Sequence, residues 1–215
     1  MTDAAGRAAP GALRLYQGMG PNSYRVRIFM AERGIGDVEM VEVRLDRGEH
    51  KTEAFRALNS LGRIPVLVLP EGTAISESVA ICRYLDEMRP GTPLFGADPI
   101  ERAKVEMWNR RLELEIFATI GNVALHSDPL FAGRIVQFPA FAAAERSAMA
   151  ARWAWLEAEM NDGRPFVAGD AFSAADVTGM VASWLGEILG IGIPDNAHHV
   201  RRWDERMRAR PSWNA

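Results

Sequence analysis

The stretch from Asn59 to Leu85, NSLGRIPVLVLPEGTAISESVAICRYL, constrains the fold of this chain more than any other. A proline precedes its apolar run Val66–Leu69, and a strand tolerates proline at its first residue, where the missing N–H costs little. Glu71-Gly72 is typical of a hairpin turn, with Thr73–Ile75 as the returning strand. Ser78 then begins an amphipathic helix. The stretch therefore predicts a β-hairpin followed directly by a helix.

The two ends of this stretch carry polar groups that suit a peptide ligand. If the Ile64-Pro65 bond is cis, the backbone N–H and C=O of Ile64 stay free to pair with an extended peptide. The Ser78 hydroxyl and the first N–H groups of its helix form a carboxylate site, and Glu77 beside them can accept from an α-amino group. We therefore expect this surface to hold a short peptide with a free amino-acid head group.

This combination resembles the glutathione-binding half of the cytosolic glutathione S-transferases. Ile64-Pro65, Glu77-Ser78 and the helix Ala80-Ile81-Cys82-Arg83-Tyr84-Leu85 match the family's thioredoxin-like domain, whose helix reads Ala-Ile-x-x-Tyr-Leu. The resemblance implies that glutathione is a co-substrate and that it binds through Ile64, Pro65, Glu77 and Ser78. A plain hairpin packed on a helix, with no ligand, is the alternative.

The amino-acid composition narrows the classes of protein to which this chain can belong. Among 215 residues, 48% are hydrophobic and 25% charged, as in ordinary globular proteins. The net charge of −3 gives no argument for binding nucleic acid or an anionic membrane, and no apolar run approaches the roughly 20 residues of a membrane span. A single cysteine favours the reducing cytoplasm. The N-terminal MTDAAGRAAPGA lacks an apolar signal core and is expected to be a loose tail.

Strand and helix patterns alternate before the opening stretch. Leu13–Tyr16 and Val38–Val43 are strand patterns, and a helix from Asn22 or Ser23 to Arg33 lies between them, so the two strands are expected to be parallel. Thr52–Leu58 is a short helix. The order β-α-β-α-β-β-α predicts an α/β unit of thioredoxin type, which we expect to span residues 12–89.

A linker rich in proline and glycine, residues 89–96, separates this unit from a region without strand patterns. Apolar residues recur there at helical spacing in three segments, near 99–126, 149–160 and 195–210. We therefore expect an all-helical second domain at residues 98–211. Ser173 and Asp176 form a capping box, worth about 0.5–2 kcal/mol. A Ser-x-x-Asp box at this place is similar to that of the second domain of the transferases.

An enzyme of this family has to stabilise a glutathione thiolate, because a thiol with a pKa of about 8.5 is mostly protonated at neutral pH. Orphan N–H groups gather in the loop Gly18–Tyr24, which enters the first helix. This loop has no cysteine, which disfavours the omega- and beta-like classes and excludes glutaredoxin chemistry. Cys82 lies in the apolar stripe of a helix and is expected to be inert.

Three side-chain donors remain near the predicted thiol: Tyr16, Asn22 and Ser23. The segment Gly20–Arg27 is similar to the Pro-Asn loop of bacterial, Nu-like and theta-like transferases, although serine-type relatives carry a hydroxyl where this chain has Gly20. Asn22, whose amide can donate to a thiolate, is the first choice for the activating residue, and Ser23 is the second. Asn22 serving as the helix N-cap is the alternative, and Tyr16 is expected to be structural.

The resemblance extends to charged positions and to partners. His50, Lys51 and Arg63 are expected to neutralise the glycine carboxylate of glutathione, whereas Arg25 and Arg27 are expected to point away, toward a subunit interface. The resemblance implies a homodimer, whose partner covers a face near Arg83, Tyr84 and Glu87. An electrophile pocket between the domains would be lined by Glu113, Phe117 and His126.

The sequence thus predicts a glutathione transferase that binds glutathione, activates its thiol and directs it at a small electrophile, as in detoxification, without a metal. A glutathione-dependent disulfide-bond reductase or peroxidase and a non-catalytic, transferase-like binding protein are the alternatives. The missing hydroxyl at Gly20 favours a binding protein, whereas the intact Glu77-Ser78 pair disfavours it. The sequence leaves the electrophile open.

Overall fold

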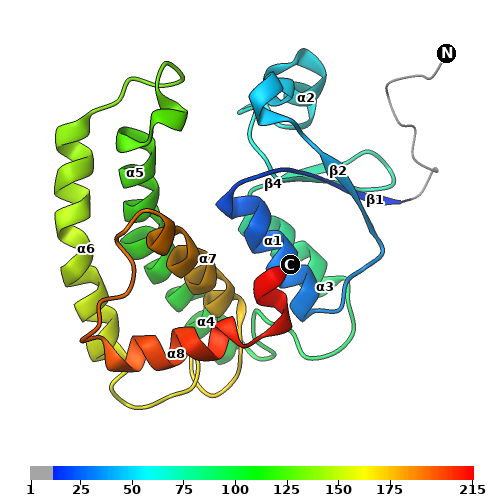
Figure 1. The fold of residues 1–215 in the computed structure, drawn as a ribbon. Coiled ribbons are helices and arrows are strands. Elements are labelled where there is room, and N and C mark those ends of the chain that lie inside the picture. The colour runs from blue at the N-terminus through cyan, green and yellow to red at the C-terminus, as the bar shows by residue number, and fades with distance from the viewer. Residues whose placement is uncertain (1–11) are drawn as a thin grey trace. The chain divides into compact units, whose positions relative to one another are not determined.

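The computed structural model describes residues 12–215, so the predicted N-terminal tail lies almost entirely outside the described residues. The chain forms two compact units that divide between Arg89 and Pro90 (Figure 1). An α/β unit with a four-stranded sheet comes first, and a helical unit follows. The predicted fold class is therefore confirmed.

The sheet of the first unit has the strand order β2-β1-β3-β4. β1 (Leu13–Gln17) and β2 (Val38–Glu42) are parallel, as the βαβ rule predicts. β3 (Val66–Val68) runs antiparallel between β1 and β4 (Ala74–Ser76), and it begins directly after Pro65. The hairpin that the sequence predicts is therefore present at the sheet edge.

Three α-helices accompany this sheet. α1 (Pro21–Glu32) connects the parallel strands and packs against α3 (Ser78–Glu87), while α2 (Glu53–Leu58) follows two 3₁₀ turns, η1 (Leu45–Arg47) and η2 (Glu49–Lys51). The predicted start of α1 was one or two residues late. Proline is preorganised for the first helical position, so the helix begins at Pro21 with Gly20 as its N-cap. Asn22 is therefore not the N-cap.

The core of the first unit lies between the sheet and the helices α1 and α3. Leu15, Phe29 and Leu67 are fully buried. Cys82 belongs to this core, where burial raises the pKa of its thiol to about 12. A thiol with so high a pKa carries almost no thiolate at neutral pH, which agrees with the expected inert role.

The helical unit contains the segments that the sequence predicts, with one irregularity. The first predicted helix is interrupted by a π-helical turn, so that one continuous segment has three parts. The elements are α4 (Pro99–Arg111), the π turn η3 (Leu112–Phe117), α5 (Ala118–Ser127), the 3₁₀ turn η4 (Pro129–Phe131), α6 (Pro139–Glu159), α7 (Ala174–Ile188), α8 (His198–Arg208) and the 3₁₀ turn η5 (Pro211–Asn214).

The predicted capping box starts α7 and is confirmed. Asp176 Oδ2 accepts from the Ser173 N–H at 2.9 Å and from the Ser173 hydroxyl at 3.0 Å. Its other oxygen accepts from the Val167 N–H and from the Trp203 indole, both at 2.9 Å. Burial raises the pKa of Asp176, and these four hydrogen bonds oppose that effect. The box therefore fixes α7, α8 and the loop before α7 together.

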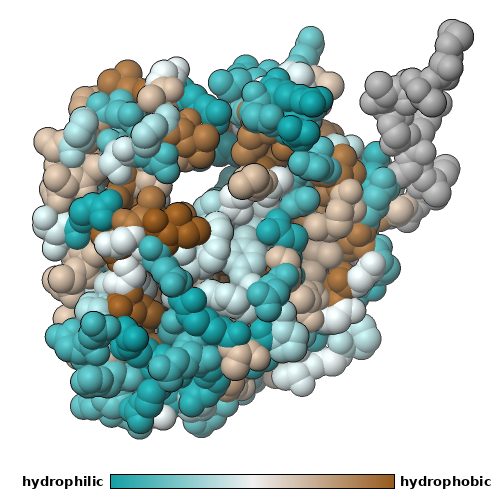
Figure 2. Space-filling model, in the orientation of Figure 1, coloured by the Kyte–Doolittle hydropathy of each residue, from teal (hydrophilic) through white to brown (hydrophobic). Residues whose placement is uncertain are grey.

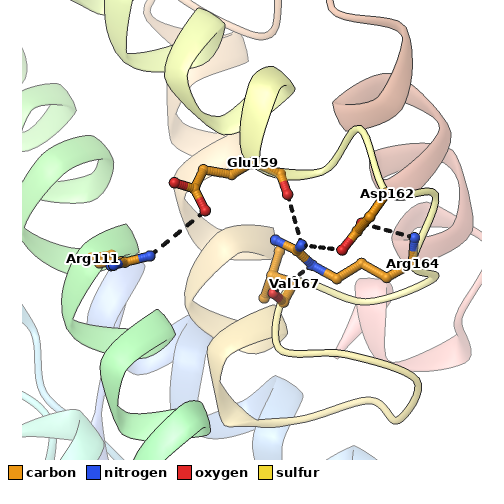
Figure 3. Close-up of polar contacts among 5 residues, drawn as sticks. All are labelled: Arg111, Glu159, Asp162, Arg164 and Val167. Atoms are coloured by element: carbon orange, nitrogen blue, oxygen red, sulfur yellow. Dashed lines mark hydrogen bonds and ion pairs between the residues drawn. The ribbon is translucent and has the colours of Figure 1, made fainter.

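Arg164 holds the turn between α6 and α7 (Figure 3). Its Nη1 donates to the Glu159 carbonyl at 2.7 Å and to Asp162 Oδ2 at 2.8 Å, and its Nε donates to the Val167 carbonyl at 3.0 Å. The bond from Arg164 lowers the pKa of Asp162. Arg111 on α4 forms an ion pair with Glu159 at 3.7 Å. Arg164 thereby holds the loop in a position from which the Val167 N–H donates to the Asp176 carboxylate.

The polarity of the surface of the helical unit differs between its two ends. Hydrophilic side chains cover α8, whereas apolar side chains gather where α5 passes into α6 (Figure 2). The exposed apolar residues at that end include Leu130, Val136, Phe138 and Phe141. Between residues 12 and 215, no helix is both long enough and apolar enough to cross a bilayer.

Candidate glutathione site

The N-terminus of α3 is held in an unusual backbone conformation. Its N-cap residue, Glu77, has φ 70° and ψ 116°, and within residues 12–215 it is the single non-glycine residue with positive φ. Such a conformation costs about 1–3 kcal/mol and persists only where its surroundings require it. The Glu77 side chain is exposed, and the following Ser78 is buried as the first residue of the helix.

The Ser78 hydroxyl joins α3 to α1. Arg25 Nη1 donates to Ser78 Oγ at 2.9 Å, and Ser78 donates to Asn22 Oδ1 at 3.3 Å. Asn22 is exposed on the first turn of α1, whereas Arg25 is only 2% exposed. The structure thus brings Asn22 and Ser78 together although 56 residues separate them.

The expectation that Arg25 points toward a subunit interface is wrong. Asn22, Arg25 and Phe29 are spaced by three and four residues, which places them on one face of α1. That face packs against α3. The spacing to the buried Phe29 was the signal that sequence reasoning missed, because a charged residue was taken to be exposed. Arg27 lies on another side and donates to Gln17 Oε1 at 2.8 Å.

Ser23 lies in the same loop but faces the interior. It is 1% exposed, and its hydroxyl accepts from the Gly18 N–H at 3.4 Å. A Cβ at Gly18 would lie 2.8 Å from the Val43 carbonyl oxygen and 3.2 Å from Ile64 Cδ1, so the loop after β1 is packed tightly beside Ile64. The structure therefore presents Asn22, and not Ser23, on the surface.

The Ile64-Pro65 peptide bond is cis. The Ile64 side chain packs against a buried cluster that includes Val43 and Phe55. Tyr16 contacts Phe55 edge to face at 6.3 Å between ring centroids, which agrees with its expected structural role.

The structure places His50 in the 3₁₀ turn η2 and Arg63 in the neighbouring loop before β3. The Arg63 side chain is exposed, while its backbone carbonyl accepts from Asn59 Nδ2 at 2.8 Å. Gly62 has φ 58°, and a Cβ there would lie 2.7 Å from the His50 carbonyl oxygen. The exposed Lys51 is the last residue of η2. These contacts bring the two predicted loops together through their backbones, and their role toward glutathione stays a prediction.

The residues expected to line an electrophile pocket belong to the helical unit. Glu113 in η3 forms an ion pair with Arg110 at 2.7 Å. His126 Nδ1 accepts from the Phe138 N–H at 3.2 Å, and its ring contacts that of Phe141. Within the described part of the chain, no group of His, Cys, Asp or Glu side chains is arranged to hold a metal ion.

Comparison with known proteins decides the family. Residues 19–88 match the model of the glutathione S-transferase N-terminal domain, and residues 131–211 match that of the C-terminal domain. The chain is 34% identical over 197 residues to glutathione S-transferase 2 of Saccharomyces cerevisiae, covering 90% of this chain and 84% of that protein. The chain belongs to the glutathione S-transferase family.

The chain is also similar to a solved structure and to a second curated protein. The crystal structure of a glutathione S-transferase domain-containing protein from Marinobacter aquaeolei VT8 superposes with a TM-score of 0.86 at 35% identity, covering 93% of this chain and 99% of that one. A maleylacetoacetate isomerase of Pseudomonas aeruginosa is 44% identical over 85 residues, or 39% of this chain and 40% of that protein. The glutathione S-transferase family uses glutathione.

Proposed function

We propose that this chain is a glutathione transferase that binds glutathione at the N-terminus of α3 and activates its thiol at the N-terminus of α1. The observation that carries the proposal is the contact between Ser78 and Asn22, 3.3 Å between Oγ and Oδ1. The predicted anchor for the peptide and the predicted donor to the sulfur are thus neighbours. A peptide as short as glutathione can reach both.

The groups at this site fit the two ends of the γ-glutamyl head. The N-terminus of α3 carries a partial positive charge, and the Ser78 hydroxyl and the buried Arg25 lie at the same point, so a carboxylate is favoured there. The exposed Glu77 carboxylate beside it suits the ammonium group. The backbone of Ile64 takes the cysteine backbone, and His50 and Arg63 are assigned to the glycine carboxylate.

Asn22 is the proposed donor to the thiolate. Its side chain is exposed and stands at the second position of α1, where backbone N–H groups without helical partners add to the positive potential. Ser23 ranks second because its buried hydroxyl already accepts from Gly18. Gly20 has φ 144°, a conformation that favours glycine. This accounts for the absence, in this chain, of the hydroxyl that serine-type relatives carry at the same position. The loop supports assignment to the Nu-like or theta-like, Pro-Asn type.

We further propose a homodimer in the cytoplasm, with a glutathione-binding domain at residues 12–89 and a helical domain at 98–211. Ile100, Met107 and Leu114 are exposed apolar residues spaced by seven along α4 and η3. This spacing forms one stripe along a helix, a pattern that suits packing against a second copy of the helix. A single-chain mass of 23.7 kDa by light scattering at all dilutions would contradict the dimer.

Isothermal titration with glutathione, combined with turnover of an activated chlorinated nitroarene, tests the proposed activity. We expect binding, turnover and a thiolate absorbance on binding. Ser78→Ala should weaken binding about 10- to 100-fold, because a hydrogen bond to a charged group is worth about 1.5–3 kcal/mol. Ser147→Ala, in the helical unit, is the control and should bind normally. Unchanged retention of Ser78→Ala on immobilised glutathione would refute the site.

A further inference from the structure

A buried arginine lies behind the proposed carboxylate site. Arg25 is 2% exposed, and its Nη1 is 2.9 Å from Ser78 Oγ. A guanidinium has donors only and stays protonated in proteins, so the Ser78 oxygen can only accept at this contact. Arg25 therefore fixes the direction of the hydroxyl from inside the protein, and the proton of Ser78 has to point elsewhere.

That proton points at Asn22. The distance from Ser78 Oγ to Asn22 Oδ1 is 3.3 Å, longer than the roughly 2.7–2.8 Å that is typical of hydroxyl donors. A serine has a single O–H, so Ser78 cannot donate to Asn22 and to an incoming carboxylate at once. Hydrogen bonds to a carboxylate are about twice as strong as those to a neutral amide. A carboxylate at the start of α3 will therefore replace Asn22 Oδ1 as the acceptor of the hydrogen bond from the Ser78 hydroxyl.

We propose that Arg25 is a positioning residue that keeps Ser78 as a donor, and that the γ-glutamyl carboxylate of glutathione displaces Asn22 from the Ser78 hydroxyl. The displaced amide is exposed on the first turn of α1, and it then turns toward the sulfur. Recognition of the carboxylate and activation of the thiol are linked through one proton. This inference rests on the proposed function, because it takes glutathione as the ligand.

The first test varies the ligand and leaves the protein intact. Wild-type protein is titrated with glutathione and with an analogue in which hydrogen replaces the γ-glutamyl α-carboxylate, and the pKa of each bound thiol is read from thiolate absorbance. We expect the analogue to bind more weakly and its bound thiol to have the higher pKa. Equal thiol pKa values would overturn the link. Failure of the wild type to bind glutathione would instead overturn the proposed function.

The second test varies Arg25 against a matched arginine on the same helix. Arg25→Met should weaken glutathione binding about 10- to 100-fold, because the Ser78 hydroxyl is then no longer held as a donor to the carboxylate, and it should leave binding of the analogue within about twofold. Arg27→Met, whose parent side chain bonds to Gln17, should change neither. Arg25→Lys should recover part of the lost affinity. An equal loss for both ligands would show a structural role only and would overturn the proposal.

Removal of a buried arginine can prevent folding, so circular dichroism precedes these titrations. If Arg25→Met is unfolded, Ser78→Ala provides the decisive comparison. Without the hydroxyl, the two ligands should differ no longer in the pKa of their bound thiols, although the wild type distinguishes them. A difference that persists in Ser78→Ala would contradict a link through this proton.

Discussion

Gly179 on α7 and Trp203 on α8 are packed so closely that an added Cβ at Gly179 would lie 2.6 Å from Cη2 of the indole. The same indole donates a hydrogen bond to Asp176, which fixes the ring so that it cannot move aside for a larger side chain. Glycine is therefore required at this position by contact and not by backbone conformation. The effect of an added methyl group on stability can be compared with its effect at a glycine in another helix.

Gly179→Ala should lower the free energy of unfolding by about 1–3 kcal/mol, the usual cost of overpacking a core. Gly121 in α5 is the matched control, because no atom lies within 4 Å of an added Cβ there. Gly121→Ala should stabilise the protein by about 0.5–1 kcal/mol, since alanine is the better helix former. Urea denaturation of both variants checks the signs, and destabilisation by Gly121→Ala would contradict this account.

Asn22→Ala should raise the pKa of the bound glutathione thiol and lower turnover at neutral pH, with little change in glutathione affinity. A charge-assisted donor worth about 1.5–3 kcal/mol corresponds to about one to two pKa units. The thiolate absorbance as a function of pH measures the shift. Ser23→Ala is the control and should have the smaller effect. If the Ser23 variant alone loses the low pKa, the two roles are reversed.

Glu77→Gly should raise the stability of the fold and at the same time lower the affinity for glutathione. Glycine adopts φ 70° without strain, so the variant should gain about 0.5–2 kcal/mol in unfolding free energy after the entropy cost of glycine is subtracted. It should also bind glutathione more weakly, because the ammonium group loses its carboxylate. Glu77→Ala keeps the strain and should show the weaker binding alone. Thermal unfolding and titration together check this, and a Gly variant no more stable than the Ala variant would argue against strain.

Glu157→Gln should reduce stability in a pH-dependent way. The Glu157 carboxylate accepts from the His199 N–H at 2.9 Å and from the Val200 N–H at 3.0 Å, at the N-terminus of α8. Desolvation alone would raise the pKa of Glu157, but these hydrogen bonds outweigh it and lower the pKa below its ordinary value of 4.5.

The stabilisation from Glu157 is therefore fully present above the unfolded-state pKa and is lost as the pH falls through the lower, folded-state pKa. At neutral pH the Gln variant should be less stable by about 0.5–2 kcal/mol, as for loss of a cap. Denaturation curves at neutral pH and near pH ~3 check the trend. The difference should shrink at the acid end, and a difference that grows there would contradict the sign.

Local patterns predicted most of the fold. The hairpin before α3 and the box of Ser173 and Asp176 depend on residues close in sequence, and both are present. The start of α1 was misplaced because Asn22 is a good N-cap by residue type, whereas Pro21 determines the first turn. The π turn at 112–117 was not predicted, because the apolar spacing does not report which carbonyl accepts each N–H.

The site was predictable only in part. Ser78 and Asn22 were identified from a resemblance, and their contact could not be derived from spacing, since it depends on how α1 packs against α3. Arg25 was misassigned because arginine is usually exposed, and only tertiary structure shows that this one is buried. The roles of His50 and Arg63 depend on a ligand conformation that no pattern in the chain encodes, so they remain predictions.

The π turn at Leu112–Phe117 has a consequence for length variation in this helix. A π turn contains one residue more than an α turn, so it behaves as an insertion absorbed within a continuous helix. Deleting Leu114, which is exposed, would restore regular α-helical bonding at the turn. Because the wide turn takes up the extra residue locally, the helix that follows would keep its rotation after the deletion. The buried Ile120 and Val123 would then stay in the core, so this helix should tolerate the loss of one residue at the turn.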